Sequence, residues 1–252
     1  MSILILAATL LFTPSLRAEV WATDTAAVQA AGQGVVGVFQ PLRYGLRDDL
    51  ELSTHTWGNL VLPGLGLKKS WHRGEHWSVA TRHGLSYPSC MLLTLAREGV
   101  PGILPADSVV PQLISLSSEG LFTRSLGSNH ALTARVRADL TAPLGAMDVP
   151  TLDLPVAFSR MASWYGYWSV RGGLGLDGRL LGQLDYQLDL DLFVLPFEDA
   201  RLAFEQRAVL AWRAREHFSV QGGVMSVWGQ YPYGTGWRLL PLVDLQWGFG
   251  GG

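Results

Sequence analysis

The 252-residue chain has a single cysteine, Cys90, which excludes an internal disulfide and a cysteine metal cluster. Charged residues are only 16% of the chain, below the roughly 25% of a typical soluble domain. The net charge is -2, so no excess of basic residues points to nucleic acid. Hydrophobic residues reach 48%, yet beyond the leader no stretch approaches the ~20 apolar residues of a membrane-spanning helix. A membrane protein built from two-faced strands would have this composition.

The N-terminal leader is apolar from Ile3 to Phe12 and ends in small residues at Ala18. This pattern is typical of a secretory signal peptide, so we predict that residues 1–18 are removed by cleavage after Ala18. A short buried or anchoring helix is the alternative. Residues 19–31 are small and polar, and they are predicted to form a periplasmic N-terminal tail.

Strict alternation of apolar and polar side chains marks residues 184–192, which read LDYQLDLDL. A strand directs successive side chains to opposite faces, so one face is apolar and the other carries three aspartates. A soluble sandwich would hide the apolar face in a core. A membrane barrel exposes it to lipid and turns the polar face toward its lumen, and we favour that interpretation.

Similar segments recur along residues 32–249. Strands are expected at residues 35–45, 50–57, 60–71, 77–87, 110–126, 130–144, 151–163, 167–176, 180–195, 201–213, 217–230 and 236–249. The predicted fold class is therefore all-β, an antiparallel up-and-down transmembrane β-barrel of about twelve strands, with ten possible. Gly58-Asn59 and Asp177-Gly178 are expected hairpin turns. Residues 88–108 interrupt the rhythm as a helical and loop insertion, with a short helix near residues 90–99.

Aromatic residues fall at the predicted strand ends, as the aromatic belts of a membrane barrel require. On this strand assignment the outer end carries Trp71, Trp77, Trp164, Tyr165, Tyr167, Trp168, Trp228, Tyr231, Tyr233 and Trp237. The periplasmic end carries Trp57, Tyr87, Trp212, Trp247 and Phe249.

The last expected strand places hydrophobic side chains on one face, at Trp237, Leu239, Pro241, Val243, Leu245, Trp247 and Phe249. Together with the leader, the alternating hairpins and the aromatic belts, this strand resembles those of bacterial outer-membrane β-barrel proteins. The resemblance covers residues 32–249 and identifies no subfamily. It implies a location in the cell outer membrane, contact with outer-membrane lipid, insertion by the barrel-assembly machinery, and a structural or porin-like passive transport role.

Charged residues on the predicted inward faces form the candidate site. A small barrel has a filled or nearly filled lumen, where buried charges need partners. We therefore expect either a neutralising network or a solute path lined by it. The candidates are Arg82, Arg135, Arg137, Asp139, Arg171, Asp185, Asp189, Asp191, Glu205 and Arg207.

The insertion contains apolar side chains that must be shielded from water, at Met91, Leu92, Leu93 and Leu95. We predict that this segment packs in or against the barrel mouth at the periplasmic end, as a partial plug.

Catalytic signatures are weak. Ser53 with His55, Ser86 with His83, and Ser128 with His130 are the serine–histidine combinations close in sequence, and none forms a recognisable signature. The turn from His72 to His76 holds two histidines and a glutamate without a tetrahedral ligand set. No metal or cofactor is therefore predicted, and the oligomeric state is left open. A lipid-modifying or lipolytic barrel enzyme and a soluble periplasmic β protein with a binding cleft are the alternatives to a passive barrel.

Overall fold

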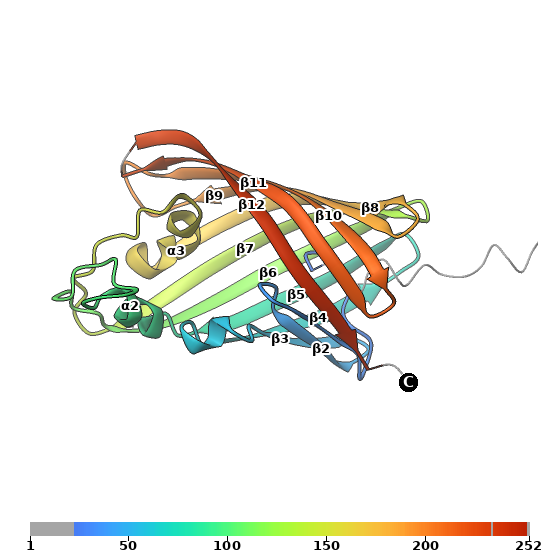
Figure 1. Cartoon of the computed structure of the whole chain (residues 1–252), viewed down its shortest axis with the longest axis horizontal. Helices are drawn as coiled ribbons and strands as arrows, with labels where there is room; N and C mark the ends of the chain where they lie inside the picture. The colour runs from blue at the N-terminus through green and yellow to red at the C-terminus, as the bar shows by residue number, and fades with distance from the viewer. Residues whose placement is uncertain (1–22, 233, 251–252) are drawn as a thin grey trace, which may run out of the picture.

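Twelve antiparallel strands close into a barrel in the computed structural model, which describes residues 23–232 and 234–250 (Figure 1). The predicted signal peptide lies outside these residues. The strands are β1 (Gly34–Gly37), β2 (Leu42–Arg47), β3 (Leu50–Thr54), β4 (Gly64–Arg73), β5 (Trp77–Ser86), β6 (Gln112–Leu126), β7 (His130–Leu144), β8 (Trp168–Leu181), β9 (Leu184–Val194), β10 (Leu202–Arg215), β11 (Phe218–Tyr231) and β12 (Gly234–Phe249). Each strand pairs with its neighbours in sequence, and β12 pairs with β1, which confirms the predicted fold class.

The helical elements in the described part of the chain are a 3-10 turn, η1 (Gly58–Leu60), and two α-helices, α2 (Ser89–Leu95) and α3 (Pro155–Gly166). None of these helices has the length and hydropathy needed to cross a membrane.

The two faces of β9 behave as its alternating sequence predicts. Leu188, Leu190 and Leu192 point outward, each 46% exposed, whereas Asp185, Asp189 and Asp191 are buried in the lumen. Register with β8 and β10 is continuous over this stretch, so each aspartate lies beside the inward residues of both neighbours. The outer surface is therefore apolar and the interior charged.

The two ends of the barrel differ in their connections. Gly34 and Phe249 lie at one end, which we call the terminal end. Turns at this end are short, such as Gly182-Gln183 between β8 and β9. The opposite end, the mouth, carries the long connections of residues 87–111, with α2, and 145–167, with α3. Bacterial membrane barrels have short periplasmic turns and longer outer loops, so the mouth corresponds to the outer end.

Two errors in the expected strands compensate one another. Residues 35–45 are not one strand: β1 ends at Gly37 and β2 begins at Leu42. Pro41, which has no amide hydrogen, lies in the bend between them. Residues 151–163 are not a strand either, because most of them belong to α3. The count of twelve survives because one strand is gained and one is lost.

The segment that becomes α3 looks alternating because Leu152, Leu154, Val156 and Phe158 follow one another at every second position. Pro155 sits at the start of the helix, where a missing amide hydrogen costs nothing. Phe158, Met161 and Ala162 are all buried, and this spacing of three and four belongs to a helix face.

The first error reverses the direction expected for the strands between residues 42 and 144. Trp71 and Trp77 therefore lie at the terminal end and Trp57 and Tyr87 at the mouth, opposite to the expectation. The 88–108 insertion likewise lies at the mouth and not at the periplasmic end. Directions after residue 167 are as expected, because the loss of a strand to α3 restores them.

Two expected turns are also wrong. Asp177-Gly178 continues within β8, paired with Gln187 and Tyr186 of β9, and the chain turns later at Gly182, where φ is 54°. Gly58-Asn59 is no two-residue turn, since η1 occupies part of a longer connection between β3 and β4.

Aromatic side chains nevertheless form two exposed rings. Trp71, Trp77, Trp212, Trp247 and Phe249 are exposed near the terminal end, and Trp57, Trp168 and Trp237 near the mouth. Exposed leucines and valines of the strands lie between the rings. An apolar band between aromatic girdles is the surface of a barrel that faces lipid.

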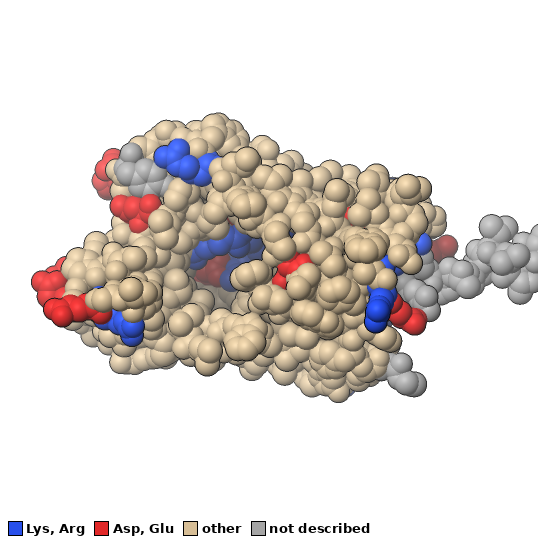
Figure 2. Space-filling view, viewed as in Figure 1, with Lys and Arg blue, Asp and Glu red and all other residues tan. Residues whose placement is uncertain are grey.

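The barrel wall is low on one side, where β1, β2 and β3 have at most six residues each. β1 pairs with β12 only from Gln246 to Phe249, and Val38 adds one further backbone bond to Leu245. On the side away from β11, residues 234–243 of β12 have no strand partner in the described chain. Figure 2 shows a hollow in this face, with charged atoms visible inside it.

Candidate functional site

The lumen contains the N-terminal segment, which we define as residues 23–31. The predicted periplasmic tail thus enters the barrel over its described part. The Ala26 amide donates to Thr123 Oγ1 at 2.8 Å, and the Gln29 amide donates to Glu51 Oε2 at 2.9 Å. Lys68, almost fully buried, donates to the Ala27 carbonyl. These contacts come from three different strands, so the segment is tied to several parts of the wall.

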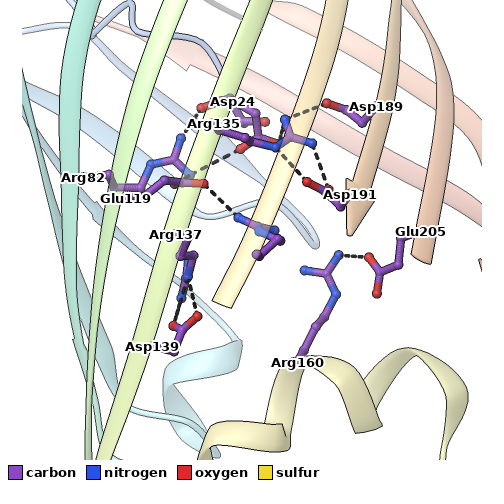
Figure 3. A network of polar contacts seen from close by, with 12 residues as sticks. Asp24, Arg82, Glu119, Arg135, Arg137, Asp139, Arg160, Asp189, Asp191 and Glu205 are labelled. Atoms are coloured by element: carbon purple, nitrogen blue, oxygen red, sulfur yellow. Dashed lines mark hydrogen bonds and ion pairs between the residues drawn. The ribbon is translucent and has the colours of Figure 1, made fainter. Parts of the chain in front are cut away.

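Asp24 lies at the centre of a charged network in the lumen (Figure 3). Its carboxylate is 2.7 Å from Arg207 Nη2, 3.3 Å from Arg82 Nη1 and 4.0 Å from Arg135 Nη1. Burial alone would raise the pKa of Asp24, but attraction to Arg207 and Arg82 holds this pKa well below its ordinary value. Asp24 is therefore ionised at neutral pH and fixes the N-terminal segment to the wall.

Arg135 joins two inward aspartates of β9. Its Nη1 is 2.7 Å from Asp189, and its Nε and Nη2 hold Asp191 at 3.0 and 2.8 Å. Arg207 also donates to Asp189, at 2.8 Å. Two guanidinium groups therefore share one carboxylate, and such charge-assisted bonds in fixed geometry are the stronger kind.

Glu119 on β6 is a second centre of the network. It is 3.2 Å from Arg82 and 2.9 Å from Arg171. Because Arg82 also contacts Asp24, the network runs from β5 and β6 through the N-terminal segment to β9 and β10.

Two further ion pairs lie nearer the mouth. Arg137 contacts Asp139 of its own strand at 2.7 Å. Arg160 of α3 contacts Glu205 of β10 at 2.6 Å, and Ser159 donates to the same carboxylate at 3.2 Å. The second pair ties α3 to the wall (Figure 3).

α3 lies across the mouth and contacts β6, β7, β8 and β11 (Figure 1). Phe158 and Ala162 pack with Phe193 and Val227 on one side. Met161 and Trp164 pack with Leu92 of α2 on the other. The helix therefore spans the mouth and is held there by apolar packing on both sides.

The structure places all ten predicted lumen residues on the inner surface. It brings nine of them into the network and the mouth pairs just described. Glu205 pairs with α3 and not with another strand, and Asp185 lies apart near the terminal end, 2.9 Å from Arg213.

Of the predicted plug residues, Leu92 is fully buried, Met91 and Leu95 pack against the same cluster, and Leu93 is half exposed. α2 thus covers the flank of α3, and α3 is the element that spans the mouth.

None of the expected serine–histidine combinations forms a catalytic arrangement. His83 shares a 3.2 Å hydrogen bond with Ser118, a residue not among those combinations, and both side chains are exposed. His72 stacks on Trp77 with ring centroids 4.0 Å apart. Within the described residues, no group of three or more His, Cys, Asp or Glu is placed to hold a metal ion.

Two cavities lie between the network and the mouth. The smaller, about 370 Å³, is polar and is lined by Asp24, Arg82, Arg171 and Glu205 among others. The larger, about 940 Å³, lies beneath α3 and borders both Gly64–Gly66 of β4 and Arg238–Leu240 of β12. These two strands flank the low wall, so the larger cavity reaches the hollow seen in Figure 2.

Sequence reasoning missed Asp24, Arg160 and the low wall. Asp24 and Arg160 lie outside the strands, so the alternation of inward and outward residues gives no signal for them. The brevity of β1 to β3 has one sequence signal, Pro41, which interrupts the first expected strand.

No protein-family profile matches the sequence, and no curated protein matches it. Among solved structures, the chain is similar to the COG4313 outer membrane channel from Pseudomonas putida F1, with 11% identity and a TM-score of 0.50. That alignment covers 90% of this chain and 99% of the channel.

It is also similar to OccK5 (OpdH) of Pseudomonas aeruginosa, with 14% identity, 86% of this chain, 62% of that chain and a TM-score of 0.43. The outer membrane protein opdK of Pseudomonas aeruginosa is 10% identical, with a TM-score of 0.40, and the alignment covers 88% of this chain and 58% of opdK. The first likeness shows that this chain has the fold of an outer-membrane channel.

Proposed function

We propose that this chain is an outer-membrane β-barrel that lets small apolar or amphipathic molecules cross passively. The route passes through the cavity beneath α3 and then through the gap in the low wall between β4 and the unpaired stretch of β12, which we call the side opening. The single observation that carries this proposal is that the larger cavity borders both β4 and the unpaired stretch of β12. An unpaired strand edge at membrane depth is tolerated only where it lines a water-filled space or pairs with a partner. The opening is thus a break in the wall with a cavity behind it.

The depth of the opening supports a route into the bilayer. Trp237 belongs to the aromatic ring at the mouth and Trp247 to the ring at the terminal end. Leu239 and Val243 lie between them on the outward face, 73% and 64% exposed. The unpaired stretch of β12 therefore begins at the outer aromatic ring and extends into the apolar band, the level of the lipid chains.

The axial route is obstructed. The N-terminal segment and the ion network fill the middle of the lumen, where Asp24 links arginines of β5, β7 and β10. A wide polar pore, as in a general porin, needs this region to be open. The lipid-modifying enzyme and the soluble periplasmic protein receive no support from the site or from the comparisons.

The test compares two leucine-to-tryptophan variants. Leu240→Trp enlarges a side chain that faces the cavity at the opening, and the control Leu192→Trp enlarges a lipid-facing side chain of β9 that lines neither cavity. Gram-negative cells that carry each variant receive the apolar fluorophore 1-N-phenylnaphthylamine, and the rate of fluorescence increase is measured. We expect Leu240→Trp to slow entry severalfold and Leu192→Trp to behave as wild type, with equal amounts of heat-modifiable barrel.

Equal entry rates for both variants would contradict the side route. A large conductance of the wild-type protein in planar bilayers would indicate an open aqueous pore instead.

A further inference from the structure

The wall of the larger cavity combines an apolar surface with an excess of positive charge. Its apolar lining includes Leu62, Met91, Val156, Met161, Trp164 and Leu240. The charged residues in the same lining are four arginines, Arg82, Arg137, Arg160 and Arg238, and one aspartate, Asp139. An apolar cavity lined by guanidinium groups that keep spare N–H donors suits a ligand with one anionic end and a hydrocarbon body.

Several of these donors remain free for a ligand. Arg160 uses Nη2 for Glu205, and 45% of its side chain is exposed. Arg137 uses Nε and Nη2 for Asp139, which leaves Nη1 available. Arg238 donates only to the Trp237 carbonyl and has no ion pair in the described chain. Three guanidinium groups thus face the cavity with spare N–H donors.

The position of these arginines orients the ligand. Arg137 and Arg160 line both cavities, so they stand at the boundary between the polar lumen and the apolar cavity. Leu65 and Leu240 lie on the strands that flank the side opening. An anionic group held at the boundary therefore leaves its hydrocarbon chain directed along the apolar wall toward the opening.

We propose that the cavity beneath α3 binds single-chain amphiphiles with a carboxylate head, which Arg137 and Arg160 hold while Arg238 attracts the head from the β12 side. This inference rests on the proposed function, because it names the class of molecule that takes the side route. Guanidinium groups bind carboxylates by paired N–H donors, which neither an alcohol nor an ammonium head can match.

The experiment uses Trp164, which lines the cavity, as a reporter. The full-length mature barrel is placed in lipid nanodiscs and titrated with 11-bromoundecanoate, whose bromine quenches nearby tryptophan. Matched probes are 11-bromoundecanol and 11-bromoundecyl-trimethylammonium. Trp164→Phe identifies the part of the quenching that arises in the cavity, since the belt tryptophans report partition into the bilayer.

We expect saturable, Trp164-dependent quenching by the carboxylate, with affinity about tenfold above that of the alcohol and higher still relative to the cation, because charge-assisted hydrogen bonds are roughly twice as strong as neutral ones. Arg160→Gln and Arg238→Gln should each remove most of the preference for the carboxylate over the alcohol. The control is Arg97→Gln, since Arg97 lies outside the cavity lining and donates to a single backbone carbonyl, as Arg238 does. If Arg160→Gln fails to form a heat-modifiable barrel, Arg238→Gln carries the test.

Three outcomes would overturn the inference. Equal affinity for acid and alcohol, in a barrel that still admits 1-N-phenylnaphthylamine, would refute the carboxylate head and leave the proposed function standing. Loss of carboxylate binding in phosphatidylglycerol nanodiscs, but not in phosphatidylcholine nanodiscs, would assign the arginines to an anionic lipid headgroup. Absence of Trp164-dependent quenching by all three probes, together with absent fluorophore entry, would refute both proposals.

Discussion

At the scale of single residues, the lumen is held by ion pairs whose central members, Arg135, Asp189 and Asp191, are buried. Arg135 has a side chain only 2% exposed, between Asp189 and Asp191. Burying charges is costly, and the cost is offset only when each charge meets partners in good geometry. The five guanidinium N–H donors of Arg135 make three hydrogen bonds to these two carboxylates. Removal of the arginine leaves the buried Asp191 carboxylate without an ion pair in the described chain, while Asp189 keeps Arg207.

Arg135→Gln is therefore expected to lower the free energy of unfolding by about 3–5 kcal/mol. Urea titration of the barrel in lipid vesicles measures this loss. The control Arg215→Gln, at an exposed strand end, should change stability by less than about 1 kcal/mol. Adding Asp189→Asn and Asp191→Asn to the Arg135 variant should recover most of the loss, and a loss no larger than that of the control would refute the role given to this network.

The sequence predicts some residues of the site and not others. Arg135, Asp189 and Asp191 lie on strands, where a period of two separates inward from outward residues, so the sequence predicts their direction. Their partners are set by strand register around the barrel, which no local pattern encodes. Asp24 and Arg160 belong to a coil and a helix, and only tertiary packing brings them to the lumen.

At the scale of elements, the long strands could be predicted and the interruptions could not. β6, β7 and β9 alternate without break and agree with the expected segments. The sequence predicts a strand where α3 lies, because apolar residues alternate by chance in the first half of the helix. β1 and β2 merge in the sequence because each is too short to show its own period.

At the scale of elements, we predict that the cost of a charged substitution depends on how deep the residue lies in the bilayer. Leu188 lies in the middle of β9, and Leu181 lies at the end of β8 beside a turn; both point outward. Leu188→Arg should cost about 2–4 kcal/mol and Leu181→Arg about 0–1 kcal/mol, because a charge is penalised most at the bilayer midplane. Folding equilibria in vesicles measure both values. Equal costs would mean that β9 does not cross the bilayer as its exposed leucines indicate.

At the scale of the whole molecule, two routes through the barrel are separated by the N-terminal segment. The axial route runs from the mouth to the terminal end and is crossed by residues 23–31 and their ion pairs. The side route runs from the mouth to the low wall and lies above most of these contacts, in the cavity beneath α3. The axial route would carry ions and hydrated solutes, whereas the side route leads to the apolar band.

This separation predicts that the two routes respond to different changes. Replacing residues 23–30 with a Gly/Ser segment of equal length removes the Asp24 carboxylate and its ion pairs with Arg82, Arg135 and Arg207, which hold the segment in the lumen, while the strands stay intact. Single-channel conductance should rise, because the lumen loses its obstruction, and entry of 1-N-phenylnaphthylamine should stay near the wild-type rate. Leu240→Trp should do the reverse, with slower fluorophore entry and unchanged conductance. If one change alters both readouts in parallel, the two routes share a single constriction, and the opening beside β12 is not a path of its own.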